Sequence, residues 1–347
     1  MISPLIPDIR HPKWSIVAKL LEIIASPRAN KIAGRLKIFD IDKFLLFIKI
    51  LILSDLFERD ISRLVSEVNE NCDLRKLLRI DSTIKADDIY RMQSDVDYDL
   101  IFLFFKRIFN SRKKLRDKKS KTVIIDTSSI VIDLNIWRNR HRIGKVNKKY
   151  KYSYCPSIGY YVGFKLILAI SQNNEILGFD LYKDCPNDSK LLIPFIEKLY
   201  RSRVIKTGDV LLCDKGFTSK ENYQTIINRF NVVPLIYPRK NTNLDNILRN
   251  LNPPLDIFFT KKYNFKIWKS VVANFKNLIH NWENFKIIRS NIEDFFNIAK
   301  NFLGLNRNHQ YTEVSIEKRV ARVIFLTQKL IPLMDELNIE KRAIPYW

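Results

Sequence analysis

The spacing of apolar residues changes near residue 118, and this change constrains the fold more than any other feature of the sequence. Before it, apolar residues recur every three or four positions, as in residues 41–68, which is typical of amphipathic helices. After it, runs rich in β-branched and aromatic residues at 121–134, 159–172 and 175–184 predict strands. We therefore expect an all-helical region followed by a domain built on a sheet.

The region after residue 118 alternates between the two kinds of pattern. The three predicted strands are followed by a helix at 187–200, a strand ending at Cys213, a helix at 219–230 and a short strand at 231–237. Asn173 and Asn174 stand between the second and third strands, as a hairpin turn requires. Asn187 or Asp188 is expected to cap the first of the two helices. This order predicts a mixed α/β sheet with helices on its faces.

Basic residues far outnumber acidic ones. Lys and Arg total 60 against 37 Asp and Glu, a formal net charge of +23. A fold does not need this excess, which creates a field that attracts polyanions, and nucleic acid is the commonest of them. The most apolar stretch, 44–57, is interrupted by Lys49 and Asp55 and falls short of the ~18 apolar residues of a membrane span. We therefore expect a nucleic-acid partner and no membrane.

Several common motifs are missing from the sequence. The N-terminus shows no signal-peptide pattern, and the four cysteines form no CxxC or Cys/His pair, which disfavours a disulfide framework and a zinc site. Glycine-rich phosphate loops and the GxSxG serine motif are also missing, so no nucleotide cofactor is expected. These features favour a cytoplasmic protein with reduced thiols.

Two aspartates emerge from predicted strands. Asp126 lies inside the first strand, and Asp214 directly follows the apolar run 210–213. Reactive groups gather beyond the carboxyl ends of strands in such sheets, and a buried carboxylate needs a positive partner. The pair therefore favours a shared metal ion, although a strand-end cap or an exposed position also explains each residue alone. Gly216 is expected to keep the following turn slim enough for DNA to approach.

A third acid lies on an amphipathic helix predicted over residues 286–305. At about 100° per residue, Glu293 falls on one face with Arg289 and Lys300, beside an apolar stripe that can dock on a sheet. Two aspartates on strands and one glutamate on a late helix suit two-metal phosphoryl transfer, because hard divalent cations take oxygen ligands. The alternative is a solvated charged face on which Arg289 and Glu293 form an i,i+4 pair.

These residues together form a recognisable pattern: Asp126, the DKGF motif at 214–217, and Arg289-x3-Glu293-x6-Lys300. The pattern resembles DDE-type transposases of bacterial and archaeal insertion sequences, in the branch with a Tyr-x2-Arg-x3-Glu-x6-Lys signature. The resemblance covers about residues 118–335 and implies an RNase H-like fold. It also implies that Asp126, Asp214 and Glu293 are catalytic and bind two Mg²⁺ ions, for which Mn²⁺ can substitute. One departure is that Lys286 stands at the tyrosine position of the signature.

A basic segment at 138–154 follows the first strand. It holds seven Lys or Arg, no acid, and three tyrosines near its end, which suits a phosphate track with aromatic rings available to stack. The alternative is a solvated or disordered loop. The residues expected to contact DNA are Arg138, Arg140, Arg142, Lys145, Lys148, Lys149, Lys286, Arg289 and Lys300. Trp268 and Trp282 either lie in the core or stack on a flipped base.

The resemblance implies a DNA transposase. It would cut one strand at each end of an insertion sequence and transfer the freed 3′-hydroxyl to a target strand. Its partners would be terminal inverted repeats and target DNA, bound by a nucleoid-associated homodimer. Two alternatives stay open: an RNase H-like nuclease that cuts without joining, and an inactive DNA-binding relic of a transposon. The expected domains are a helical region at 1–118, which either binds DNA or serves as a scaffold, a catalytic domain at 119–335 with a small insertion around 240–285, and a tail at 336–347.

Overall fold

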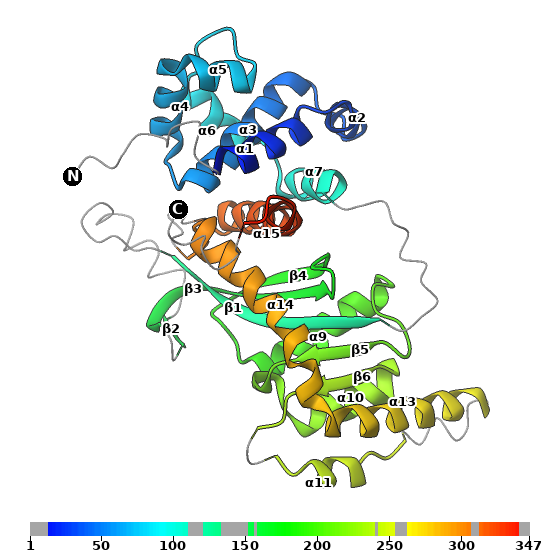
Figure 1. Ribbon diagram of the computed structural model, residues 1–347. Helices are drawn as coiled ribbons and strands as arrows, with labels where there is room; N and C mark the ends of the chain where they lie inside the picture. Colours follow the sequence, from blue (N-terminus) through cyan, green and yellow to red (C-terminus); the bar gives the residue numbers. More distant parts are fainter. Residues whose placement is uncertain are drawn as a thin grey trace. The chain divides into compact units, whose positions relative to one another are not determined.

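The computed structural model describes residues 13–109, 121–132, 152–155, 158–239, 242–253, 262–306 and 312–339 (Figure 1). The chain forms two compact units. One, the helical unit, joins Met1–Arg112 to Asn297–Trp347, and the other, the sheet unit, is Lys113–Phe296. The domain boundaries expected at residues 118 and 335 stay predictions.

The helical unit contains the all-helical N-terminal region that the sequence predicts. Its described helices are α1 (Lys13–Ile24), α2 (Pro27–Arg35), α3 (Ile41–Phe57), α4 (Ile61–Glu70), α5 (Cys72–Leu78), α6 (Ala86–Asp95), α7 (Tyr98–Phe109), the π-helical turn η3 (Ile298–Phe302) and α15 (Glu313–Glu336). The long helix α15 packs against α7 and α1. The C-terminal helix therefore completes a core that the first helices begin.

Helix α3 runs through the core of the helical unit. Most of its side chains are buried, including those of Lys49 and Asp55. The Lys49 ammonium donates a hydrogen bond to the Leu78 carbonyl oxygen at 3.0 Å, which provides a partner for this buried charge. In the described ranges, no helix is both long enough and apolar enough to cross a membrane. The prediction that residues 44–57 form a buried helix is therefore confirmed.

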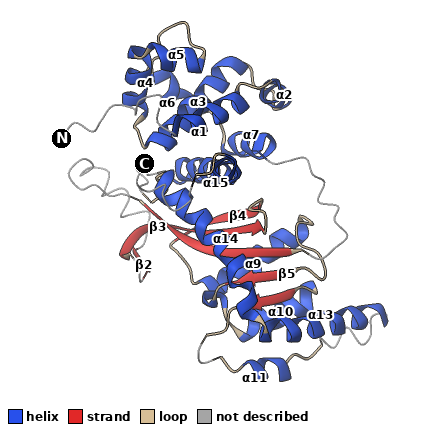
Figure 2. Ribbon diagram, viewed as in Figure 1, coloured by secondary structure: helices blue, strands red, loops and turns tan. Residues whose placement is uncertain are grey.

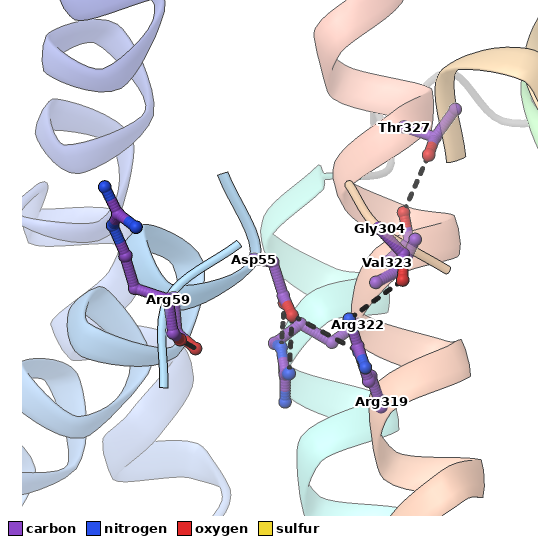
Figure 3. Close-up of polar contacts among 8 residues, drawn as sticks. Asp55, Arg59, Gly304, Arg319, Arg322, Val323 and Thr327 are labelled. Atoms are coloured by element: carbon purple, nitrogen blue, oxygen red, sulfur yellow. Dashed lines mark hydrogen bonds and ion pairs between the residues drawn. The ribbon is translucent and has the colours of Figure 1, made fainter. Parts of the chain in front are cut away.

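A buried ion cluster joins α3 to α15 (Figure 3). Asp55 accepts hydrogen bonds from Nε of Arg322 and, at 3.0 Å, from its Nη2, and both residues are only 3% exposed. Nε of Arg319 lies 3.7 Å from Asp55 Oδ1, and its Nη2 donates to the Gly304 carbonyl oxygen at 3.0 Å. The cluster therefore connects α3, α15 and the chain directly after η3.

The sheet unit is built on one mixed sheet (red in Figure 2). Its strands are β1 (Thr122–Val131), β2 (Tyr152–Cys155), β3 (Gly159–Ser171), β4 (Ile176–Lys183), β5 (Val210–Cys213) and β6 (Val233–Ile236). The strand order is β2-β3-β1-β5-β6, and β4 also pairs with β3. The pairs β1–β3, β2–β3 and β3–β4 are antiparallel, whereas β1–β5 and β5–β6 are parallel. The short strands β5 and β6 are buried at every position.

Helices flank this sheet, and among them are the three predicted near 187–200, 219–230 and 286–305. The flanking helices are α9 (Asp188–Arg201), α10 (Lys220–Phe230), α11 (Leu244–Arg249), α13 (Lys262–His280) and α14 (Lys286–Asn297), with 3-10 turns η1 (Lys215–Phe217) and η2 (Trp282–Phe285). Ser219 caps α10, because its hydroxyl accepts a hydrogen bond from the Asn222 amide at 3.0 Å. Asn174 has φ 59° in the β3–β4 turn, as a hairpin requires. The predicted fold class, a mixed α/β sheet preceded by a helical region, is confirmed.

One strand was not predicted. Residues 152–155, expected to end a basic loop, form β2, in which Tyr154 pairs with Tyr160 of β3. Their rings meet edge to face, with centroids 5.2 Å apart, and both side chains are exposed. The prediction that Tyr152 and Tyr154 lie in a loop is therefore wrong, because cross-strand pairing extends the sheet at this point.

Candidate active site

Two neighbouring strands bring Asp126 and Asp214 together. β1 and β5 are parallel, and Ile125 of β1 pairs with Cys213 of β5. Asp126 and Asp214 stand one position beyond this pair, at the same level of the sheet. Adjacent strands lie about 4.8 Å apart, so the two carboxylates belong to one site. The apolar residues before each aspartate hold it there, because Val123–Ile125 and Val210–Cys213 are fully or almost fully buried.

Arg289 of α14 connects these aspartates to the third predicted acid. Its Nη1 lies 3.9 Å from Asp126 Oδ2 and 3.7 Å from Asp214 Oδ1. Its Nη2 forms an ion pair with Glu293, one turn further along α14. The Asp126 and Arg289 side chains are 19% and 20% exposed, so this contact is shielded but open to solvent. The structure thus gathers three distant carboxylates around one guanidinium.

Asp126 stays poorly compensated despite this guanidinium. Its pKa is raised to about 7, mainly by burial and in smaller part by the charges of Asp214 and Asp188. The Thr127 amide, which donates to Asp126 Oδ1 at 2.7 Å, and the charge of Arg289 act in the opposite direction. The net rise in pKa indicates that the site has room for more positive charge than Arg289 supplies.

The donor atoms of this site suit a hard divalent cation. Asp126, Asp214 and Glu293 offer only carboxylate oxygens, the ligands that Mg²⁺ and Mn²⁺ take in proteins. Over the described ranges, no set of three or more His, Cys, Asp or Glu side chains stands in a ready metal-binding arrangement. Instead, each of the three carboxylates forms an ion pair with Arg289. The residues therefore fit a metal ion by chemistry, with Arg289 as its competitor.

Comparison with known families decides the identity of the chain. A family model described as the transposase DDE domain matches residues 117–327, more than half of the chain. The chain belongs to this family. No curated protein matches the sequence at a significant level. The match covers nearly all of the sheet unit and most of α15, and it confirms the resemblance inferred from the sequence. The transposase acts on DNA, as its family does.

The other residues predicted to contact DNA fall into three groups. Lys286 is exposed at the start of α14, where it pairs with Glu283 and lies 5.8 Å from the Tyr237 ring centroid. Lys300 lies in the helical unit of the transposase, within η3. The remaining residues, Arg138, Arg140, Arg142, Lys145, Lys148 and Lys149, lie outside the residues that the structure describes. Their roles stay predictions.

The single helix predicted over residues 286–305 is wrong in its last part. α14 ends at Asn297 and is followed by the π-helical turn η3. A π turn has more residues than an α turn, so the angular position of Lys300 does not follow from 100° steps along an α-helix. The apolar side of the prediction holds, because Ile292, Phe295 and Phe302 are buried.

A cavity of about 840 Å³ adjoins Asp214 in the sheet unit. Its lining includes Gly216, Tyr237, Arg239 and Trp282. Tyr237 and Trp282 pack with ring centroids 4.0 Å apart, and Trp282 is buried, as is Trp268. Both tryptophans therefore contribute to the core, in agreement with the first of the two interpretations that their sequence allowed.

The sequence did not identify a second polar network beside the acids. Asp188 accepts hydrogen bonds at its Oδ1 from the Thr127 hydroxyl at 2.8 Å and from the Lys165 ammonium at 2.9 Å. Sequence patterns suggested only that Asp188 or Asn187 caps α9. Asn187 is the cap residue but makes no side-chain capping bond. Nothing local signals the true contacts of Asp188, because its partners are 61 and 23 residues away.

Proposed function

We propose that the transposase cuts one DNA strand at each end of its insertion sequence and joins the freed 3′-hydroxyl to a target strand. The observation that carries this proposal is the meeting of Asp126, Asp214 and Glu293 at Arg289. Membership of the transposase DDE domain family and the net charge of +23 support DNA as the substrate. Two ends must be joined, so a homodimer is the smallest assembly that we expect on DNA.

In this proposal, Asp126 and Asp214 hold Mg²⁺, and Glu293 completes the ligand set. Bound divalent cations would supply Lewis-acid stabilisation of the negative charge that develops on phosphoryl oxygens. The protein positions the ligands: two strand ends carry the aspartates, and the contacts of Arg289 with both aspartates hold α14, and with it Glu293, beside them. Lys286 is exposed beside the site, where its ammonium suits a DNA phosphate. Lys300 and the six basic residues of 138–149 are proposed as further phosphate contacts.

Arg289 is expected to compete with metal ions for the carboxylates and also to contribute to DNA cleavage, and one substitution can separate these two roles. Without DNA it offsets the three carboxylates, and with DNA its guanidinium is free to pair with a phosphate. Arg289→Ala should therefore bind Mn²⁺ several-fold more tightly, because a competing cation is gone, yet cleave DNA about 100-fold more slowly. Calorimetric Mn²⁺ titration and single-turnover cleavage at pH 8 measure the two effects. Weaker Mn²⁺ binding in this variant would contradict the competition between Arg289 and the metal.

The central experiment is strand cleavage of DNA that carries the genomic sequences flanking this reading frame. We expect nicks at fixed positions with Mg²⁺ or Mn²⁺ and none with a chelator. Glu293→Gln should reduce the cleavage rate by more than about 100-fold, because it removes a proposed metal ligand. Loss of a residue that only supports such a ligand already lowers metal affinity or activity by about 10–100-fold. Asp294→Asn is the matched control, since its side chain leaves the same helix about 100° away. Full activity of Glu293→Gln would remove Glu293 from the mechanism.

The products of the same reaction separate the proposed function from its alternatives. Joining of the cut 3′ end to a second duplex supports a transposase that completes strand transfer. Cleavage that never yields joined products indicates a nuclease. Salt-sensitive DNA binding without any metal-dependent cleavage indicates a relic, because phosphate contacts survive the loss of a metal site.

A further inference from the structure

Asp188 lies at a junction of three segments of the sheet unit. Its Oδ1 accepts hydrogen bonds from Thr127 of β1 and Lys165 of β3. Its Oδ2 lies against the backbone of Gly216, since a Cβ built on that glycine would be 2.8 Å from this oxygen. Gly216 belongs to η1, the turn that directly follows Asp214. The Asp188 carboxylate therefore binds side chains of β1, which carries Asp126, and of the neighbouring strand β3. It also lies close to η1, the turn that follows Asp214.

The hydrogen bonds that Asp188 makes with Thr127 and Lys165 lie on the face of β1 opposite to Asp126. Thr127 follows Asp126 in an extended strand, so the two side chains point to opposite faces of the sheet. Thr127 pairs with Ile167, and Ser129 pairs with Lys165, which places Thr127 and Lys165 diagonally on one face. Asp188 thus contacts β1 on the face of the sheet opposite to Asp126. Its Oδ1 is already held by the Thr127 hydroxyl and the Lys165 ammonium, so we assign Asp188 a supporting contact and not a place among the metal ligands.

The ion pair between Lys165 and Asp188 is partly shielded from solvent. The Lys165 and Asp188 side chains are only 17% and 29% exposed, and the hydroxyl of Thr127 shares the same oxygen. A hydrogen-bonded pair of this kind resists displacement better than a solvated one. Gly216 is therefore expected to need its hydrogen side chain: a methyl group there would push against a carboxylate that two donors hold in place.

We propose that Asp188 is a positioning residue of the active site, which keeps β1, β3 and the turn after β5 in the arrangement that brings Asp126 and Asp214 together. The inference rests on the proposed metal-binding role of those two aspartates. It assigns Gly216 a contact within the protein, where the sequence suggested only clearance for DNA. Contacts behind metal ligands commonly account for 10–100-fold in metal affinity or activity.

The first test is Mn²⁺ binding to the full-length protein without DNA, measured by calorimetry. Asp188→Ala should bind Mn²⁺ about 10-fold more weakly than the natural protein. Asp188→Asn, which keeps the shape and the acceptor for Thr127, should lie between the two. The control is Asp180→Ala, which removes another Asp–Lys ion pair between the sheet and α9, that of Asp180 with Lys198, and should leave Mn²⁺ affinity unchanged. In cleavage assays Asp188→Ala should lower kcat without raising KM for DNA.

The second test approaches the same contact from the other side. Gly216→Ala should weaken Mn²⁺ binding about 10-fold in the natural protein, because its methyl displaces the Asp188 carboxylate. In the Asp188→Ala background the displaced oxygen is absent, and Asp188 Cβ stands at an ordinary 3.6 Å from the new methyl. Gly216→Ala should then have no further effect. Such non-additivity is the signature of a direct contact in a double-mutant cycle.

Three results would overturn the inference. One is Mn²⁺ binding by Asp188→Ala and Asp188→Asn equal to that of the natural protein. Another is an equal loss from Gly216→Ala in both backgrounds. The third is an Asp180→Ala loss as large as that of Asp188→Ala, which indicates general loosening. Thermal melting identifies variants that do not fold. If Asp188→Ala does not fold, the Mn²⁺ affinity of the milder variant Asp188→Asn tests the inference in its place. If the natural protein binds no Mn²⁺, the proposed function itself fails, and the two failures are thus distinguishable.

Discussion

Asp126→Asn is expected to reduce metal-dependent DNA cleavage by more than about 100-fold while the protein stays folded. The amide keeps the size of the side chain and can still accept the hydrogen bond from the Thr127 amide. It removes the negative charge that a divalent cation needs. Burial raises the pKa of Asp126 to about 7, so the ionised form is costly in the folded protein. The neutral amide should therefore not lower the free energy of unfolding.

Two measurements check this expectation together. Single-turnover cleavage gives the loss of rate, and denaturant unfolding gives the change in stability. Asp180→Asn is the control, because it neutralises an aspartate of the same sheet that pairs with Lys198 and not with Arg289. A cleavage rate within a few-fold of the natural protein would show that Asp126 is not a ligand. A large loss of stability would mean that its charge, not its shape, holds β1 beside β5.

Asp55→Ala is expected to destabilise the helical unit by about 3–5 kcal/mol, the usual effect of removing one partner of a buried ion pair. This is a large part of the roughly 5–15 kcal/mol that stabilises an ordinary domain. Arg322 is 3% exposed and pairs with Asp55 through two nitrogens, so the substitution leaves a buried guanidinium without its counter-charge. Arg319 loses the same carboxylate.

Hydrogen exchange followed by mass spectrometry checks this prediction, because it reports on each unit separately. Amides of α3 and α15 should exchange much faster in Asp55→Ala, whereas those of β1 and β3 should not change. Glu336→Ala is the matched control, since it removes the exposed pair that Glu336 of α15 forms with Lys19 of α1. Asp55→Leu combined with Arg322→Met should recover most of the loss, because apolar residues can replace a buried pair. Unchanged exchange in α3 would contradict the role of the cluster.

The sequence predicted the elements whose signals are local. The apolar run 210–213 predicted a buried strand with Asp214 directly after it, and β5 is indeed buried at all four positions. Glu293 was predicted because Arg289 and an apolar stripe share its helix, and the structure places it beside Arg289. Asp188 was missed because its contacts join residues that only the folded sheet brings together. The single α-helix predicted over 286–305 was wrong in its last part for a different reason: a π turn changes the phase of the helix, and no residue type in 298–302 predicts it. The DNA-contact role of Lys300 stays a prediction.

The closure of the helical unit by α15 has a consequence for how the protein is made. Helices α1–α7 leave the ribosome first, but Asp55 meets its arginines only after roughly 200 more residues have been added. At about 5–20 residues per second, this delay is on the order of 10–40 s. During that interval the apolar surfaces that α15 later covers are open to chaperones and proteases. A chain truncated before α15 would leave Asp55 without its arginines, so we expect it to be degraded faster than the full chain.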